Sequence, residues 1–440
     1  MIEWLHEFIW GPGMLGLFLL VGVIYTIKLR GFPVLKFSQW WRNTVGSLLK
    51  GNSAHPDGIS GFQSACTALA ATIGTGNIAG VATALLAGGP GAIFWMWIAA
   101  FLGMATAYGE TELGIRYRRH DRSGNWISGA MVYLENGVRC RWLAVLYAVF
   151  CILASFGMGS MVQSNAISET FECSFSLPPF LVGVGITILA ARIIVGGARS
   201  IVRTAEKLVP VSAAIYMAAA VTVMILFGKR IPWVFATIIE DAFSFSGITG
   251  GILGFFVSDA VRYGVARGVF SNEAGLGSMA ALNGGTDHTE PGMQGQWAIF
   301  EVFFDTIISC TLTAVVILCV TGEELPAYRG NGAELVTQCF TAGLGNFGGY
   351  LVSLCVMLFA FATIIAWYYM GKQAVVYLEE TTGFSVAPVY TFLYLACVFF
   401  GCLGPMKEVW EISDVFNGLM AIPNLLALLF LVKEVHPPRN

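Results

Sequence analysis

A polar interruption in an apolar run is the first sign of chemistry in this chain. Two glycines, Gly74 and Gly76, enclose a threonine and precede Asn77, a combination that disfavours a continuous helix. Within a bilayer, an opened backbone is tolerated only where protein buries it or where it lines a cavity. The broken ends offer carbonyl oxygens to a cation and amide N–H groups to an anion. The stretch therefore predicts a site that holds a zwitterion together with a coupling ion, as transport requires.

A second interruption follows in the stretch 264–278, where glycines again alternate with polar residues. Ser271 or Asn272 is expected to cap a new half-helix, with Glu273 in its first turn. Ser271 and Asn272 are also expected to lie at the binding site. Interrupted helices at corresponding positions of two halves point to a site near the bilayer midplane. The alternative is that the glycines only permit close helix packing. Polar side chains beside them are costly in lipid, which favours the first interpretation.

Composition also predicts a membrane protein. Hydrophobic residues make up 56% of the 440 residues, charged residues make up 12%, and the mean hydropathy is +0.71. The net charge of −3 gives no reason to expect a nucleic-acid partner. No catalytic constellation, cofactor motif or obligate protein partner is evident, so we expect a transporter surrounded by lipid rather than an enzyme. The ten cysteines fall mostly in apolar runs and should be buried, with a pairing of Cys173 and Cys339 left open.

Hydropathy along the chain predicts an all-α, multi-pass membrane protein with about eleven spanning segments. These are expected at 13–30, 60–88, 90–116, 141–165, 179–198, 207–228, 249–283, 295–320, 348–371, 386–404 and 413–432. The second and seventh segments contain the interruptions, so the second half would repeat the first with inverted topology. The predicted units are an N-terminal helix with a cytoplasmic loop at 1–59, five-helix repeats at 60–228 and 229–432, and a cytoplasmic tail at 433–440.

Basic residues gather in alternate loops between these segments. Three loops contain most of the basic residues, which include Lys28, Arg30, Lys36, Arg116, Arg118, Arg199 and Arg203. By the positive-inside rule, the N-terminus lies outside and the C-terminus lies in the cytoplasm, with the chain in the plasma (inner) membrane.

Long motifs resemble those of the alanine or glycine:cation symporter family. The stretches 62–83 and 88–97 are similar to one signature of that family, and 262–278 is similar to another. Shorter matches begin at Glu206 and Glu301, and the resemblance extends over essentially the whole chain. It implies the five-plus-five inverted repeat of the leucine-transporter class with one extra N-terminal helix. It also implies sodium-driven uptake of alanine or glycine.

Within this frame, the two sides of the first break would take different parts of the substrate. Backbone amides of Thr75 and Gly76, directly before Asn77, would face the substrate carboxylate at the start of a half-helix. Carbonyl groups of the preceding half-helix would face cations or the substrate ammonium, near Ala70, Thr72 and Ile73.

The other walls of the pocket are expected from later segments. In the fourth segment, Gly157 would give a glycine-lined face and Gln163 an amide, although an ideal helix places them on different faces unless the glycines distort it. An interhelical hydrogen bond is the alternative role for Gln163. Phe270 and Trp367 would close around a small side chain, which suits alanine or glycine better than a branched substrate.

Resemblance to the wider fold also implies a sodium site. The carbonyls of Ala70 and Ile73 would hold the ion with hydroxyls of the ninth segment, where Thr363 lies, and hard oxygen donors suit sodium. The family usually has Ser or Thr before Thr363, whereas this chain has Ala362, so one expected ligand is missing. No acidic residue is expected beside the break at Gly74 and Gly76, so neutral oxygens and the carboxylate of the substrate would hold the sodium.

Several charged residues fall inside predicted segments, namely Asp259, Arg262, Arg267, Glu301 and Asp305. Glu301 and Asp305 are four residues apart and share a helix face. We predict ion pairs between the seventh and eighth segments, because an unpaired charge in a membrane is expensive. Such pairs would form either a structural clamp or a gate.

The expected function is therefore a sodium-coupled symporter that imports alanine or glycine by alternating access. Proton coupling is an alternative, although all five histidines fall in loops or tails. An amino-acid sensor with a transporter-like fold is a further alternative, which would normally carry a signalling domain. The sequence leaves open the choice between alanine and glycine, the tolerance of D-amino acids, the stoichiometry and the oligomeric state.

Overall fold

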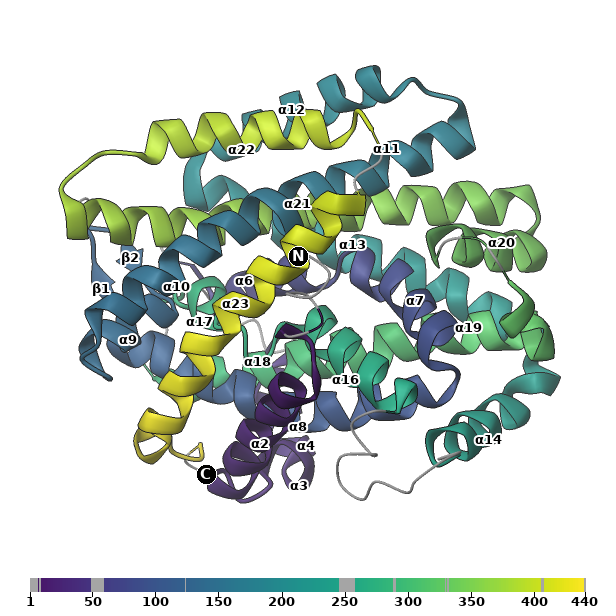
Figure 1. The fold of residues 1–440 in the computed structure, drawn as a ribbon, viewed down its shortest axis with the longest axis horizontal. Coiled ribbons are helices and arrows are strands. Elements are labelled where there is room, and N and C mark those ends of the chain that lie inside the picture. The colour runs from purple at the N-terminus through teal and green to yellow at the C-terminus, as the bar shows by residue number, and fades with distance from the viewer. Residues whose placement is uncertain are drawn as a thin grey trace.

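The protein is a bundle of helices (Figure 1). The computed structural model describes residues 7, 9–48, 59–122, 124–244, 258–287, 290–328, 330, 332–404 and 407–438. Within them, strands occur only in an antiparallel hairpin of β1 (Arg119–His120) and β2 (Trp126–Ile127). The predicted all-α class is confirmed.

Six helical runs among these residues are long and apolar enough to cross a membrane. They are α8 (Gly91–Tyr117), Arg141–Phe175, α13 (Gly197–Leu226), Pro291–Ala327, α21 (Asn346–Thr382) and Val409–Glu434, the last formed by α23 (Lys407–Leu431) and η6 (Val432–Glu434). Shorter apolar helices are α2 (Pro12–Lys28), α7 (Ala79–Gly88), α12 (Pro179–Val195) and α22 (Ala387–Gly401). The predicted segments fall on helices, except that 249–257 lies outside the described residues. The number of spans and the division into repeats stay predictions.

The first predicted interruption lies where the sequence places it. Helix α6 (Gly61–Thr72) ends before Gly74, a short turn η1 (Thr75–Asn77) follows, and α7 then continues. Helix α6 begins with a capping box, in which Ser60 Oγ accepts from Gln63 N at 3.1 Å and Gln63 Oε1 accepts from Ser60 N at 3.0 Å.

The second interruption differs from the prediction. Ser271 and Asn272 end the half-helix α16 (Asp259–Asn272), and the next half-helix, α17 (Ser278–Asn283), begins only after Gly277. The expectation that Ser271 or Asn272 caps the new half-helix, with Glu273 in its first turn, is wrong. Glu273 instead ends α16 in the left-handed conformation, with φ of 56°. The glycines that follow, including Gly277 at φ of 84°, adopt backbone angles that end one helix and delay the next.

The broken helices lie inside the bundle. Half-helix α6 packs against α13, α21 and α17, while α16 packs along α8 and α7 (Figure 1). Helices α12 and α22 lie side by side at the upper edge of that view, away from the breaks. Close packing of α16 on α8 requires a glycine, since a Cβ on Gly264 would lie 2.3 Å from the carbonyl oxygen of Ala92.

Two further helices are distorted without being broken. The run 141–175 comprises α10 (Arg141–Ala154), the π-helical turn η2 (Ser155–Met161) and α11 (Val162–Phe175). The run from Pro291 comprises α18 (Pro291–Val302), the π-helical turn η4 (Phe303–Cys310) and α19 (Thr311–Thr321). Such π-helical turns occur frequently at functional sites, and both of these lie beside the breaks, as the contacts below show.

The remaining elements connect and cover these helices. They are α3 (Phe32–Leu35), α4 (Phe37–Asn43), α5 (Val45–Leu48), α9 (Ala130–Asn136), η3 (Gly228–Arg230), α14 (Ile231–Ala242), η5 (Gly322–Ala327) and α20 (Gly332–Leu344). Helix α14 also caps α8, because Asp241 Oδ2 accepts from Gly91 N at 2.7 Å.

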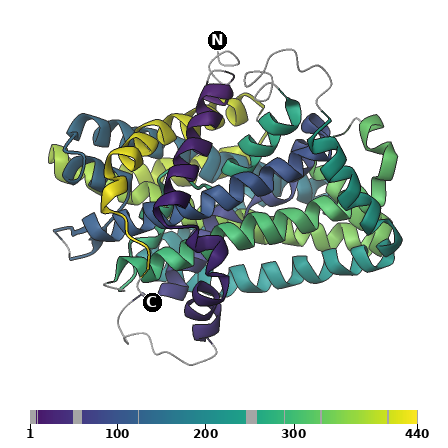
Figure 2. The same ribbon diagram turned by 90° about the horizontal axis from the view of Figure 1, so that it is seen from below.

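The first and last described helices begin and end on opposite faces of the bundle. Helix α2 begins at the upper face in Figure 2, whereas α3, α4 and the residues after η6 lie toward the lower face. All ten cysteines are free, and Cys173 is exposed while Cys339 is buried, so the pairing left open by the sequence does not occur.

Gly264→Ala is expected to destabilise the folded protein. The added methyl group would clash with the backbone of α8, and overpacking of a core costs about 1–3 kcal/mol. Thermal unfolding in detergent measures the effect. The matched control is Gly185→Ala in α12, where a Cβ would meet nothing within 4 Å. Equal melting temperatures for the two variants would contradict the close contact of α8 with α16.

Candidate substrate and ion site

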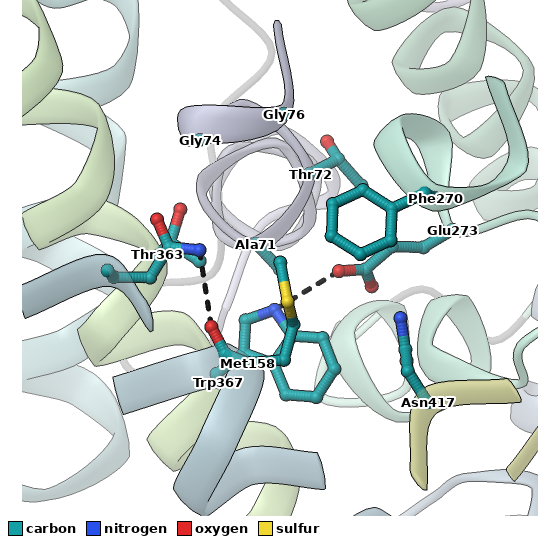
Figure 3. Close-up of a pocket in the computed structure, with 11 residues that line it drawn as sticks. Ala71, Thr72, Gly74, Gly76, Met158, Phe270, Glu273, Thr363, Trp367 and Asn417 are labelled. Carbon is teal, nitrogen blue, oxygen red and sulfur yellow. Dashed lines mark hydrogen bonds between the residues drawn. The ribbon is translucent and has the colours of Figure 1, made fainter. Parts of the chain in front are cut away.

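A small cavity lies at the first break (Figure 3). It has a volume of about 10 Å³, room for roughly one water molecule. Its walls come from the first break, η2, α11, the end of α16, α21 and α23. The lining residues are Ala71, Thr72, Gly74, Gly76, Met158, Gln163, Phe270, Glu273, Thr363, Trp367 and Asn417.

Asn77 holds the opened backbone of the first break. Its Oδ1 accepts from Gly74 N at 3.1 Å, and its backbone carbonyl accepts from Thr313 Oγ1 at 2.8 Å. Its Nδ2 donates to Asp305 Oδ1 at 2.6 Å. Asn77 is buried and faces η4 rather than the cavity, so it supports the break from behind.

Asp305 joins the two breaks. Its Oδ2 accepts from Ser271 Oγ at the end of α16 and from Thr306 Oγ1, both at 2.8 Å. Asn272 Nδ2 in turn donates to Thr306 Oγ1 at 3.1 Å. Ser271 and Asn272, like Asn77, therefore lie beside the cavity and not in its wall. The cluster of carboxylate, amide and hydroxyl oxygens is the kind of donor set that hard cations prefer.

The predicted ion pairs between the seventh and eighth segments are wrong. Asp305 receives hydrogen bonds from neutral side chains, and Glu301 Oε2 accepts from Asn283 Nδ2 at 3.0 Å. Arg267 NH1 lies 4.0 Å from Asp414 Oδ2 of α23. The physical reason is that buried amide and hydroxyl side chains of neighbouring helices donate to these acids and satisfy them without a basic partner.

The other two charged residues lie away from the breaks. The Arg262 guanidinium lies 5.8 Å from the centre of the Tyr263 ring, and Asp259 is an exposed residue in the first turn of α16.

The residues of the predicted sodium site come together at the end of α6. Thr363 Oγ1 of α21 donates to the carbonyl oxygen of Ala70 at 2.9 Å, and Ile73 ends the half-helix with a non-helical ψ of 87°. A Cβ on Gly74 would lie 2.7 Å from Thr363 Oγ1. Ala362 is buried and its side chain has no oxygen. The predicted donors are therefore the carbonyls of Ala70 and Ile73 and the hydroxyl of Thr363.

The π-helical turn η2 explains how Gln163 reaches the break. Gln163 Nε2 donates to Met158 O at 3.2 Å, and its Oε1 accepts from Thr75 Oγ1 at 3.3 Å. Gly157 does not line the cavity, because it faces α23, where its Cβ would lie 2.0 Å from Ser413 Oγ. Gly159 instead lets Trp367 approach, since its Cβ would lie 2.4 Å from Trp367 Cβ.

Phe270 and Trp367 line the cavity as predicted, and Glu273 lies between them (Figure 3). Trp367 Nε1 donates to Glu273 Oε1 at 3.1 Å. The expectation that no acidic residue lies beside the first break is therefore wrong. The sequence places Glu273 far from Gly74, and only the contact between the two broken helices brings them to one cavity.

Met158, Ala71, Glu273 and Asn417 are lining residues that sequence reasoning missed. Ala71 lies one position before the predicted Thr72, and Glu273 directly follows the predicted Asn272. Asn417, in the last predicted segment, has a sequence signal as well, because a buried amide in a spanning helix is costly unless it has a role.

A larger cavity of about 310 Å³ lies on the other side of Phe270. It is lined by Glu7, Trp10, Arg262, Tyr263, Ala266, Arg267, Phe270, Glu411 and Asp414. The Arg267 guanidinium lies 5.4 Å from the centre of the Phe270 ring and lies 4.0 Å from Asp414. Phe270, which lines both cavities, thus lies between them, and the ion pair lies on the side of the larger one.

Two interrupted helices that meet at a buried cavity define a secondary transporter of the leucine-transporter fold, not an enzyme. The fold is similar to that of MhsT in complex with L-phenylalanine, with a TM-score of 0.61, 14% identity and coverage of 86% of this chain and 90% of that one. A Na⁺-coupled sialic acid symporter in a substrate-bound outward-open state gives a TM-score of 0.52 at 14% identity, covering 96% and 82%.

The chain belongs to the sodium:alanine symporter family, which it matches over residues 1–437. It is 40% identical over 439 residues to the sodium/alanine symporter AgcS of Methanococcus maripaludis, covering 98% of this chain and 94% of that protein. It is 35% identical over 434 residues to the probable sodium/glutamine symporter GlnT of Bacillus subtilis, covering 98% and 87%. The family identified by resemblance is thus confirmed.

Asn77→Ala is expected to abolish most sodium-driven amino-acid uptake in proteoliposomes while the protein still inserts. Gly74 N and Asp305 would both lose a buried partner, and each such loss costs about 1–3 kcal/mol. The control is Thr83→Ala in α7, whose hydroxyl donates to Ala79 O of its own helix at 2.8 Å. Full transport by Asn77→Ala would show that the break is not part of the site.

Proposed function

We propose that this protein is a sodium-coupled symporter that imports alanine, glycine or both across the plasma membrane by alternating access. The observation that carries the proposal is the cavity of about 10 Å³ at the meeting point of two interrupted helices. A cavity of this size must widen to take any amino acid, and a substrate with a very small side chain needs the least widening. The relative named as a sodium/alanine symporter supports the same substrate class.

The carboxylate of the substrate would bind at the amides of Thr75 and Gly76. These groups lie in the turn η1 just before α7, where N–H groups outside a helix and the dipole of the helix that follows favour an anion. A Cβ on Gly76 would lie 3.7 Å from Ser271 Cα, so the backbone there is close to α16. Gln163, which accepts from the Thr75 hydroxyl, would fix the turn beside the carboxylate.

The side chain of the substrate would point toward Met158, Phe270 and Trp367. All three are buried and line the cavity. Their bulk leaves room for a hydrogen atom or a methyl group, which agrees with glycine or alanine.

Sodium would bind at the carbonyls of Ala70 and Ile73 with the hydroxyl of Thr363. The 2.9 Å hydrogen bond between Thr363 and Ala70 supports this site, because both oxygens already converge there. An ion at this position would hold α6 against α21, which links ion binding to closure of the cavity.

The cavity beyond Phe270 would open to the outside. It is lined by residues near the start of α2 and of α23, on the face opposite to α3 and α4, which belong to the basic loop after the first predicted segment (Figure 2). The positive-inside rule places the basic loop in the cytoplasm. Separation of Arg267 from Asp414 and rotation of Phe270 would then open the substrate cavity from outside.

Proton coupling is the second candidate, because Glu110, Glu273, Glu301 and Asp305 are all buried. Uptake of labelled alanine and glycine into proteoliposomes, with either a sodium or a proton gradient imposed, distinguishes the two. We expect accumulation to follow sodium. Accumulation that follows the proton gradient and ignores sodium would overturn the sodium assignment.

Thr363→Ala is expected to raise the sodium concentration for half-maximal uptake by about tenfold, the equivalent of about 1.4 kcal/mol. The variant removes one oxygen from the proposed ion site without changing the substrate walls formed by Met158 and Phe270. Thr363→Ser, which keeps the hydroxyl, is the control and should retain most of the sodium affinity. An unchanged sodium dependence in Thr363→Ala would argue against this site.

Met158→Ala is expected to widen the range of substrates. Removing a long side chain from the wall leaves space for larger groups, so competition by serine, valine and glutamine against labelled alanine should strengthen. The comparison is the ratio of inhibition constants in the variant and the original protein. The same ratio in both would mean that Met158 does not limit substrate size.

A further inference from the structure

Two buried oxygen acceptors that line the substrate cavity have no hydrogen-bond partner among the described residues. They are Glu273 Oε2 and Asn417 Oδ1, in side chains that are 3% and 1% exposed. In Figure 3, Asn417 of α23 extends toward the Glu273 carboxylate with its amide nitrogen nearest, and a half-turn of the amide group brings Oδ1 to that place. Buried acceptors without a donor are rare and costly, so a cavity with two of them is suited to a ligand that brings N–H groups.

We propose that Glu273 and Asn417 bind the ammonium group of the substrate. The inference rests on the proposed function and adds to it the groups that recognise the positive end of the amino acid. An ammonium carries three N–H donors. Glu273 Oε2 and Asn417 Oδ1 accept two of them, and the carbonyl groups at the end of α6 face the third.

The charge of Glu273 has no basic counterpart in the described part of the chain. Its recorded neighbours are neutral, because Trp367 Nε1 donates to Oε1 and the Ser278 hydroxyl lies nearby. A buried carboxylate without a counter-charge is strongly unfavourable. The ammonium of a zwitterion supplies this charge, while the carboxylate of the same zwitterion lies on the amides of the first break.

The local backbone delivers Glu273 to this position. Glu273 has φ of 56°, in the left-handed region that residues other than glycine, asparagine and aspartate seldom adopt. Backbone strain of this kind persists where the surrounding structure requires it, and it clusters at ligand-binding positions. The hydrogen bond from Trp367 to Oε1 then orients the carboxylate so that Oε2 is left for the ligand.

The arrangement also predicts which molecules the site rejects. Lactate has the size and carboxylate of alanine, but a hydroxyl group replaces its ammonium. It cannot neutralise Glu273, and its own negative charge is repelled. The site therefore distinguishes alanine from lactate by charge, because the two molecules are nearly equal in size.

The test is Glu273→Gln, with alanine and lactate as the two probes. Dissociation constants are measured by ligand-induced thermal stabilisation of the detergent-solubilised protein in sodium, so that a loss of transport does not hide binding. We expect alanine affinity to fall by at least about tenfold, the usual consequence of losing a charged hydrogen-bond partner. Lactate affinity should stay constant or rise, so the preference for alanine over lactate collapses.

Glu301→Gln is the matched control. Glu301 is also a buried glutamate with one oxygen that has no partner among the described residues, but it accepts from Asn283 and does not line the cavity. It should leave the ratio of alanine to lactate affinity unchanged. Asn417→Ala provides a second variant, and we expect it to weaken alanine by about fivefold, the loss of one neutral acceptor.

The outcomes separate the inference from the function on which it rests. If the original protein shows no sodium-dependent binding of alanine or glycine, the proposed function fails, and this inference fails with it. If the original protein binds alanine but Glu273→Gln and Asn417→Ala both keep its preference over lactate, only the ammonium site is overturned. Equal weakening of alanine and lactate by Glu273→Gln would likewise overturn it, because a structural role affects both ligands alike.

Discussion

An unwound helix inside a membrane protein must find partners for its backbone groups outside itself, and this constraint shapes the centre of the molecule. At the first break, Asn77 accepts from Gly74 N and Thr313 donates to Asn77 O. At the second break, Asn272 Oδ1 accepts from Ala274 N at 3.0 Å. Farther along the second break, Glu110 Oε1 accepts from Gly277 N at 3.1 Å. Two of these four partners, Thr313 of α19 and Glu110 of α8, come from neighbouring helices, so satisfying the backbone also joins those helices to the breaks.

The acidic residues beside the breaks accept hydrogen bonds from polar groups of the breaks and of neighbouring helices more than they form ion pairs. Asp305 holds Asn77 and Ser271 on separate helices, and Asn424 donates to both Glu110 and the carbonyl of Gly275, at 2.5 and 2.9 Å. A basic partner would neutralise such an acid but would satisfy no backbone group. The contact of Arg267 with Asp414 instead lies at the larger cavity, where charged groups are less deeply buried.

The sequence predicts the local features of this arrangement and misses those that depend on distant contacts. Glycines beside Asn77 are a local signal, and the break lies where they predict it. The two π-helical turns have weak local signals in the sequence. They orient Asp305 and Gln163 toward the breaks, and this orientation depends on packing between helices. The two errors at Glu273 have different causes. The glycines after it end α16 and delay the start of the next half-helix, which the sequence does not reveal. Its approach to Gly74 depends on tertiary contact between the two broken helices.

Side-chain hydrogen bonds, unlike a continuous helical backbone, let two half-helices tilt independently while each keeps its partners. Helix α7 contacts η1 and α16, whereas α6 contacts α13, α17 and α21. The two halves of one broken helix are therefore held by different sets of neighbours, and the small cavity lies where the sets meet. A ligand that binds both the amides of η1 and the groups at the end of α16 draws these sets together, so that occupation of the cavity and its closure become the same event.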